Sequence, residues 1–486
     1  MQGIIALPLK NLASEESKMY RNLNNDQLDI YDFILPFGGH LKEDNRWVKL
    51  RKMINWEMVR EIYGSIFENK DAGREAYPGD VAFGALYIQS KLGVTDRELV
   101  DQIAENPYMQ YFIGYKEYRN ERPFDPSLLV SFRKRLPESA MSEILERTFI
   151  AHCGVKDTQE GVPENAGAPE NDIDNGSGND GNGSDSNAGT GSVSDSHEIS
   201  EGSGSEGSDE EAVLANKGTL IIDATCAPPT LPTPQTLTCA TRLRYQLGCI
   251  DRNLGYISEY EKAHGLTDLK NIEKERLATI RTFHAQQKEM LDNRTHSIPD
   301  RIVSLAQPWV RPIVRGKAKS PTEFGAKISI SVINGYAFVD RISFGAYNEG
   351  EAGEFERTVE NYRRRFGRYP ERVLADKLYR SRANRAFCKK HGIRISGPRL
   401  GRPGKDYADE LRQELKEIGE RNAVEGKFGN GKRKFNLARI MAKLKETAST
   451  MIMRDVFVLN MERLFRQGCC FHTVSSYQLF LIFFQG

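Results

Sequence analysis

The sequence predicts an α/β protein in which a mixed sheet flanked by helices follows an all-helical region. Short apolar runs at residues 217–225 and 372–376 have the length and the bordering residues of buried strands. The first 150 residues or so instead show apolar positions at helical spacing. These patterns divide the chain into four parts: a helical region over 1–154, a linker over 155–212, an α/β domain over 213–465 with an insertion at about 228–319, and an irregular tail over 466–486.

Charge is distributed unevenly along the 486 residues. The segment 157–211 has 15 Asp and Glu residues, has neither Lys nor Arg, and is otherwise rich in Gly, Ser and Asn. It cannot bury enough apolar surface to offset chain entropy, so we expect a disordered acidic linker that acts as a solvated spacer or as a DNA mimic. Outside this segment 52 acidic and 68 basic residues leave a net charge of about +16. A basic body of this kind favours a polyanionic partner over a surface that is merely solvated.

Composition argues against several classes of protein. The seven cysteines show no C-x-x-C spacing, which argues against a zinc finger and a disulfide scaffold. The amino terminus lacks a signal-peptide pattern, and the apolar stretch 477–484 is too short to span a bilayer. We therefore expect a protein of the reducing cytoplasm with no membrane segment.

The helical region contains the outline of a helix-turn-helix. Residues 81–91 have a helical pattern that Gly93 interrupts. Thr95, followed three residues later by Glu98, forms a capping box that starts the next helix. Such a pair can place its second helix in a DNA groove, although most helical hairpins bind nothing.

Two other basic stretches are candidate phosphate-binding segments. A helix predicted after Pro126 carries Arg133 and Arg135. The loop 307–319 is punctuated by proline, contains a tryptophan, and carries the basic residues Arg311, Arg315, Lys317 and Lys319. Side chains of this kind contact DNA phosphates, and a rigid surface loop would have a similar composition.

The α/β domain begins with the strand at 217–225. The insertion that follows contains a predicted long helix at 272–291. Alternating apolar residues at 327–332, and then Asn334-Gly335, predict a β-hairpin. The remaining predicted elements are a returning strand over 336–344, a helix over about 351–366, a strand at 372–376, a helix over 382–391, a strand at 393–396, and one or two helices from 409 past 425. Strand, hairpin, helix, strand, helix and strand is the order of a ribonuclease H-like domain.

Three carboxylates stand out by their positions in this domain. Asp223 and Asp376 each end a short apolar strand, and Glu425 lies on the last predicted helix among basic residues. The two strands can be neighbours in a mixed sheet, and the acids would then form a cluster that is unfavourable unless cations neutralise it. Oxygen-only ligation selects Mg²⁺ or Mn²⁺, and two such ions suit in-line displacement at a phosphodiester.

Each carboxylate also has a purely structural interpretation. Asp223 and Asp376 would then cap turns, and Glu425 would pair with Arg421. Each acid taken alone fits that role, whereas the set of three indicates a metal site.

Several stretches resemble the DDE transposases of bacterial insertion sequences, in the branch whose first acid lies in a D-A-T-C-A-P motif. The matching stretches are 223–228 (DATCAP), 311–319 (RPIVRGKAK), 323–327 (EFGAK), 369–376 (YPERVLAD) and 391–398 (HGIRISGP). The region 79–136, with FDPSL at 124–128, resembles the amino-terminal helical domain of that family. Together these stretches are distributed over most of the chain outside the linker.

The resemblance implies a DNA transposase whose ribonuclease H-like domain binds Mg²⁺ or Mn²⁺, as two ions, through Asp223, Asp376 and Glu425. Such an enzyme binds the terminal inverted repeats of its element, cleaves them and transfers the strand to target DNA. It would act on the nucleoid as a homodimer or a larger assembly on DNA, without a small-molecule cofactor.

A further motif of the wider group surrounds the third acid, with a Tyr-Arg-Glu-Lys spacing. Arg421, Glu425 and Lys432 fit this spacing, and Ile418 stands where the tyrosine would be. By resemblance, Arg421 and Lys432 would steer the phosphates of the transposon ends. Glu420, next to Arg421, is the alternative for the third acid.

The chain departs from the family pattern directly after Pro228. A longer, basic, helical insertion is expected there, whereas 229–241 is low in charge and rich in Pro and Thr. Arg242 falls mid-way through what resembles the later helix of that insertion, and the ending from Gly468 is also irregular. These departures indicate an internal deletion or a frame disturbance. The alternatives to an active transposase are a decayed remnant that binds DNA without catalysis, and a metal-dependent nuclease of the same architecture.

Overall fold

The computed structural model describes residues 29–35, 38–67, 76–155, 215–227, 240–314, 322–398 and 407–483, with the backbone alone at 240–241 and 469–483. Most of the predicted linker, most of the departure at 229–241, and Arg315, Lys317 and Lys319 therefore lie outside the described residues. The described residues on the two sides of the linker belong to one compact unit.

Among the described residues seven α-helices precede the linker, in the region that apolar periodicity predicts to be helical. They are α1 (Arg46–Met53), α2 (Trp56–Ser65), α3 (Gly79–Leu92), α4 (Asp96–Glu105), α5 (Pro107–Phe112), α6 (Leu128–Arg135) and α7 (Glu138–Phe149), with 3-10 turns at Ile30–Asp32 and Ile150–Cys153. Gly93 ends α3 in the left-handed conformation, with φ of 69°, which costs glycine little. The Thr95 side chain accepts a hydrogen bond from the backbone N–H of Glu98 and so caps α4.

The predicted helix–turn–helix boundary is confirmed, but its second helix carries little positive charge. Leu99, Val100 and Ile103 bury the inner side of α4. The exposed side chains of α4 are Arg97, Glu98 and Glu105. Because binding to DNA depends on neutralising phosphates, this surface is poorly suited to a recognition helix.

Five strands form a mixed sheet in the order β5-β4-β1-β6-β7. They are β1 (Thr219–Ala227), β4 (Ala326–Ile333), β5 (Tyr336–Ser343), β6 (Arg372–Leu374) and β7 (Arg394–Ile395), and β2 (Pro312–Val314) pairs with β3 (Thr322–Phe324) in a separate two-stranded sheet. β4 is antiparallel to β1 and β5, whereas β1, β6 and β7 are parallel. The predicted hairpin is confirmed, and Asn334 and Gly335 at its turn both have positive φ, as a type I′ turn requires.

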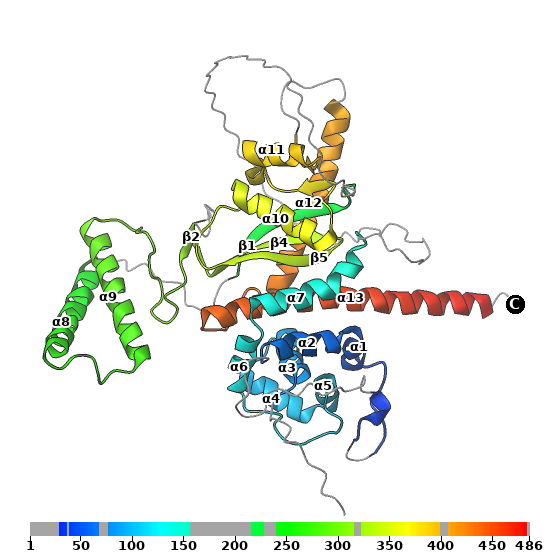
Figure 1. The fold of residues 1–486 in the computed structure, drawn as a ribbon, viewed down its shortest axis with the longest axis horizontal. Coiled ribbons are helices and arrows are strands. Elements are labelled where there is room, and N and C mark those ends of the chain that lie inside the picture. Colours follow the sequence, from blue (N-terminus) through cyan, green and yellow to red (C-terminus); the bar gives the residue numbers. More distant parts are fainter. Residues whose placement is uncertain are drawn as a thin grey trace, which may run out of the picture. The chain divides into compact units, whose positions relative to one another are not determined.

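Six α-helices accompany these strands (Figure 1). They are α8 (Ala240–His264), α9 (Asn271–Asp292), α10 (Ala352–Phe366), α11 (Arg382–Lys390), α12 (Tyr407–Lys434) and α13 (Lys445–Phe483), with a 3-10 turn at Lys377–Tyr379. The helix predicted at 272–291 is α9, and α8 packs against it to form a hairpin within the insertion. α13 continues through a segment in which we expected an irregular tail from residue 466. Between 466 and Phe483 the sequence contains no proline, so nothing there blocks helix propagation.

One prediction about the first strand was wrong. We expected Asp223 at the end of a strand, whereas β1 continues four residues further, to Ala227. The reason is that β1 has two partners of different length. Its pairing with β6 stops at Ile221, while its pairing with β4 runs on to Ala227. Asp223 thus lies just beyond the β6 pairing and in the middle of the β4 pairing.

Helix α13 joins the helical region to the sheet. The Phe457 ring lies 5.3 Å from both the Phe83 ring of α3 and the Phe149 ring of α7. One turn away on the same helix, the Asn460 side chain donates to the Ala337 carbonyl of β5 at 2.8 Å and accepts from the Ala337 N–H at 2.9 Å. A single hydrophobic core therefore extends from the amino-terminal helices to the sheet.

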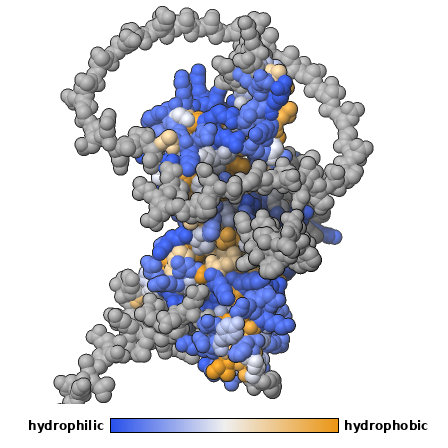
Figure 2. Space-filling view, turned by 90° about the vertical axis from the view of Figure 1, so that its right-hand side faces the viewer, coloured by the Kyte–Doolittle hydropathy of each residue, from blue (hydrophilic) through white to orange (hydrophobic). Residues whose placement is uncertain are grey.

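The surface of the molecule is mainly hydrophilic on the face that Figure 2 presents, with hydrophobic residues in small patches. Among the described residues, every helix is too short or too polar to be a candidate membrane span.

Candidate active site

The register of the sheet relates two of the three predicted acids. Thr219 to Ile221 of β1 pair in parallel with Arg372 to Leu374 of β6, where the pairing ends. Continued by two residues, the same register would bring Asp376, which follows β6, level with Asp223. Neighbouring strands lie about 4.8 Å apart, so the two aspartates are expected to lie close together.

Contacts of Arg372 show which helix covers the Asp223 side of β1. Its Nε donates to Thr219 Oγ1 at 2.7 Å, and its guanidinium lies 2.8 Å from Glu420 of α12. Side chains four residues apart on a strand point to the same face, so Asp223 points to the same face as Thr219. That face is the one on which α12 lies, which is also the helix that carries Glu425.

Asp376 already has two partners in the protein. Its Oδ1 accepts from the N–H of Lys377 at 2.7 Å and caps the following 3-10 turn, as the structural interpretation predicted. The same oxygen lies 3.0 Å from Nη1 of Arg421, and the Asp376 side chain is 60% exposed. Asp223 Oδ1 accepts from the N–H of the next residue, Ala224, at 2.8 Å. Oδ1 of each aspartate is thus already engaged within the protein.

The glutamates of α12 differ sharply in their surroundings. Glu425 is exposed, one helical turn beyond Arg421, which pairs with Asp376 instead. Glu420, the alternative for the third acid, is engaged by Arg372 at 2.8 Å. Glu417 is 3% exposed and pairs with Arg394 of β7. Of these three acids, Glu425 is therefore the one whose carboxylate is not already held by an arginine of the sheet.

Other residues of α12 complete the motif around Glu425. Ile418, at the position expected for tyrosine, is 43% exposed. Lys432 is half-buried and has contacts of its own. Burial, together with the charge of Arg463, lowers the pKa of Lys427 to about 8.

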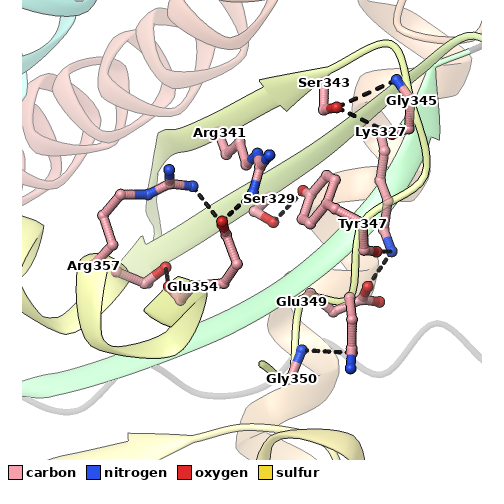
Figure 3. Close-up of polar contacts among 12 residues, drawn as sticks. Lys327, Ser329, Arg341, Ser343, Gly345, Tyr347, Glu349, Gly350, Glu354 and Arg357 are labelled. Carbon is pink, nitrogen blue, oxygen red and sulfur yellow. Dashed lines mark hydrogen bonds and ion pairs between the residues drawn. The ribbon is translucent and has the colours of Figure 1, made fainter. Parts of the chain in front are cut away.

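A set of paired acids lines a small cavity that Asp223 also borders. These acids are Asp340, Glu349 and Glu354. Figure 3 shows that Lys327 binds Glu349 and that Arg341 and Arg357 bind Glu354. Their charges are thus already neutralised by the protein.

The predicted ligands do not form a gathered metal centre. Within the part of the chain that the structure describes, no three His, Cys, Asp or Glu side chains lie close enough together to hold a metal ion. The donor set of Asp223, Asp376 and Glu425 nevertheless fits a hard divalent cation, because it consists of carboxylate oxygens alone. Arg421 provides the positive charge beside Asp376 in this arrangement.

The predicted DNA contacts are only partly on the surface. Arg133 was expected to face DNA, but it is 6% exposed, and it binds Asp96 and Gln89 inside the core. It is buried because α6 packs against α3 and α13, and this packing could not be deduced from the basic run alone. Arg135 is half-buried over the Phe67 ring at 5.2 Å.

Arg311 is also partly committed to the protein. Its side chain donates to the carbonyls of Pro308 and Val310, and it lies 3.7 Å from Asp300. It remains half-buried, so part of the guanidinium faces solvent.

Sequence reasoning missed Arg372 and Arg394 as residues of this site. They lie on neighbouring strands and are paired with each other in the register of β6 and β7. Arg372 is half-buried, whereas Arg394 is exposed on the edge strand β7. Because burying a charge without a partner is costly, an arginine in a predicted buried strand was the available signal, and it applies to Arg372.

Comparisons with known proteins match two separate parts of the chain. A family described as "Transposase domain (DUF772)" matches residues 36–135, which include α1 to α6. A family described as "Transposase DDE domain" matches residues 373–462, which include Asp376 and Glu425. An "Uncharacterized protein ORF8 in nfe locus" from Rhizobium meliloti is 30% identical over 104 residues, or 21% of this chain. The chain spans about half (49%) of the length of that curated relative.

No solved structure matches the chain. Both matched families are described as transposase domains. The two family matches support a DDE transposase of the insertion-sequence type.

Proposed function

We propose that the protein binds the terminal inverted repeats of its own element, cleaves them with the help of divalent cations, and joins the freed ends to target DNA. The observation that supports this proposal is the parallel register of β1 and β6 beside α12, which, continued by two residues, would bring Asp376 level with Asp223. Glu425 would be the third acid of this site.

The strand order supports a ribonuclease H-like catalytic domain. Of the five strands in the main sheet, the first in the chain, β1, is central. The antiparallel hairpin of β4 and β5 lies on one side of it. β6 and β7, which are parallel to β1, lie on the other side. This is the arrangement expected from the predicted order of elements.

Asp223, Asp376 and Glu425 would hold Mg²⁺ or Mn²⁺, as two ions. When bound, these cations activate the attacking water or hydroxyl and stabilise the leaving oxygen of the phosphodiester. The contribution of the chain itself is to position groups. Arg421 would move from Asp376 to a DNA phosphate, since both are anions that its guanidinium can bind.

DNA would be bound by basic residues around this site. Lys432 lies on the same helix as Arg421, and Arg311 belongs to the basic loop whose other candidates are Arg315, Lys317 and Lys319. Arg135 would contribute from α6. The protein would act on the nucleoid in the cytoplasm, as a homodimer or a larger assembly on DNA.

A second candidate is a remnant that occupies the element ends without cutting them. The observation that favours it is the ion pair of Asp376 with Arg421, together with the absence, among the described residues, of three gathered metal-binding side chains. In this case the acids would serve as the cap and the ion-pair partner already seen in the structure.

The two candidates can be separated with labelled DNA that carries the inverted repeats flanking the gene. The proposed transposase should bind these ends and, with Mg²⁺, cleave them and join them to a target. Asp376→Asn and Glu425→Gln should abolish cleavage and retain end binding. End binding without cleavage by the unmodified protein would favour the remnant. Cleavage that survives in Asp376→Asn would refute the proposed acids.

A further inference from the structure

Two ion pairs connect α12 to the sheet, through glutamates that lie about one helical turn apart. Glu417 pairs with Arg394 of β7, and its carboxylate also accepts from Gln413 at 2.9 Å. Glu420, three residues later, pairs with Arg372 of β6 at 2.8 Å. We refer to these two pairs, Glu417–Arg394 and Glu420–Arg372, as the α12 clamp.

The two arginines of the clamp belong to a row of three residues that are paired across three strands. Thr219 of β1 pairs in register with Arg372 of β6, and Arg372 pairs in register with Arg394 of β7. The Arg372 side chain links the row internally, because its Nε donates to Thr219 Oγ1 at 2.7 Å. Two arginines at a strand spacing of about 4.8 Å thus face two glutamates on one side of α12.

Each predicted acid lies four or five residues after a residue of this row or of the clamp. Asp223 is four residues after Thr219 on β1, and Asp376 is four residues after Arg372. Glu425 is five residues after Glu420, about 7.5 Å along the helix axis. Arg372 and Asp376 therefore belong to one short segment, and Glu420 and Glu425 to one helix.

Two other kinds of contact also hold α12. One is the ion pair of Arg421 with Asp376, and the other is the packing of the buried side chains of Val424 and Phe428. Apolar contacts are non-directional, so the rotation of the helix depends mainly on its ion pairs. A slip of a single residue would turn Glu425 by about 100° and shift it by about 1.5 Å.

We propose that Arg372 and Arg394 are positioning residues for the third acid. By holding Glu420 and Glu417, they set the rotation and height of α12 and so place Glu425 over the edge of the sheet where Asp223 and Asp376 lie. This inference rests on the proposed function. It also assigns Glu420 to a structural task, so that it is not the third metal ligand.

The test measures metal binding directly and does not depend on catalysis. Mn²⁺ is titrated into the full-length protein, and free Mn²⁺ is followed by electron paramagnetic resonance at room temperature. Arg372→Glu and Glu420→Arg each place like charges at the pair, and the double variant Arg372→Glu/Glu420→Arg restores an ion pair of reversed polarity. Loss of a residue that orients a metal ligand typically weakens metal affinity about 10- to 100-fold.

The matched control is a charge reversal at a different ion pair, which connects β5 to α10. Arg341 and Glu354 have side-chain exposures of 30% and 20%, against 25% and 29% for Arg372 and Glu420, and are drawn in Figure 3. Arg341→Glu should lower the unfolding temperature as the clamp variants do, and should leave Mn²⁺ binding unchanged. If the substitutions acted only by unfolding the protein, both the unfolding temperature and Mn²⁺ binding would change in all variants, including Arg341→Glu.

We expect each single clamp variant to weaken Mn²⁺ binding at least about tenfold, and the double variant to return to within about threefold of the unmodified protein. Single variants with unmodified affinity, or a folded double variant no better than the singles, would overturn the clamp. If Arg372→Glu does not fold, Glu420→Gln, which keeps the side-chain shape, is judged by the same tenfold criterion. An unmodified protein that binds no Mn²⁺ would overturn the proposed metal site itself, and this result is visible before any variant is made.

Discussion

Replacing Arg421 by alanine is expected to strengthen Mn²⁺ binding while weakening DNA cleavage. The guanidinium of Arg421 lies 3.0 Å from Asp376 Oδ1. A cation that is to use this oxygen must first displace the arginine. The substitution therefore removes a competitor of the cation, and it also removes a basic partner for the DNA phosphates.

The size of the first effect follows from the exposure of the pair. The side chains of Arg421 and Asp376 are 24% and 60% exposed, so water screens their attraction. Ion pairs of this kind contribute about 0 to 1 kcal/mol. Because 1.4 kcal/mol corresponds to a tenfold change in affinity, Mn²⁺ binding should tighten by up to about fivefold.

The assay is a Mn²⁺ titration of the full-length protein without DNA, followed by cleavage of labelled ends. Arg421→Lys keeps the charge and should stay close to the unmodified affinity. Arg412→Ala is the matched control, because Arg412 forms an exposed pair with Asp409 on the same helix at 2.9 Å. The reasoning is refuted if Arg421→Ala binds Mn²⁺ more weakly, because Arg421 would then support the acids instead of competing for them.

Three further substitutions test the core around the site. Asn460→Ala should lower the free energy of unfolding by about 2 to 4 kcal/mol in denaturant titrations, because it leaves the N–H and C=O of Ala337 without their partner; no change would show that water replaces the side chain. Burial opposes ionisation of Glu146, but hydrogen bonds from arginines such as Arg364 lower its pKa. The stability that the charged carboxylate contributes should therefore be lost as the pH falls below about 4.5. In thermal unfolding, Glu146→Gln should make the stability depend less on pH in this range. Arg133→Ala should destabilise the fold and leave the salt dependence of DNA binding unchanged; a smaller salt slope would mean that Arg133 reaches phosphate after all.

Much of the fold could be predicted because its signals are local. Asn334 and Gly335 accept positive φ, so they specify the hairpin turn by themselves. Gly93 and Thr95 likewise define the end of α3 and the start of α4 through backbone freedom and one side-chain cap. Interactions within four residues are enough to determine such features.

Features that depend on residues distant in the sequence could not be predicted in the same way. Arg133 lies in a basic run that looks exposed, and it is buried because α6 packs against helices from both ends of the chain. The β1 strand extends past Asp223 because its two neighbours differ in length. Both outcomes depend on partners that are more than 30 residues away in the sequence.

The sequence by itself determined the order of the elements and the identity of the candidate acids, since turn residues, caps and apolar spacing are encoded in neighbouring residues. The tertiary structure decided how the glutamates of α12 are used. Glu417 and Glu420 meet the arginines of β7 and β6, while Glu425 stays exposed. The physical reason is that three carboxylates on one helix have nearly the same local propensities, and only the register of that helix on the sheet brings two of them to a positive charge.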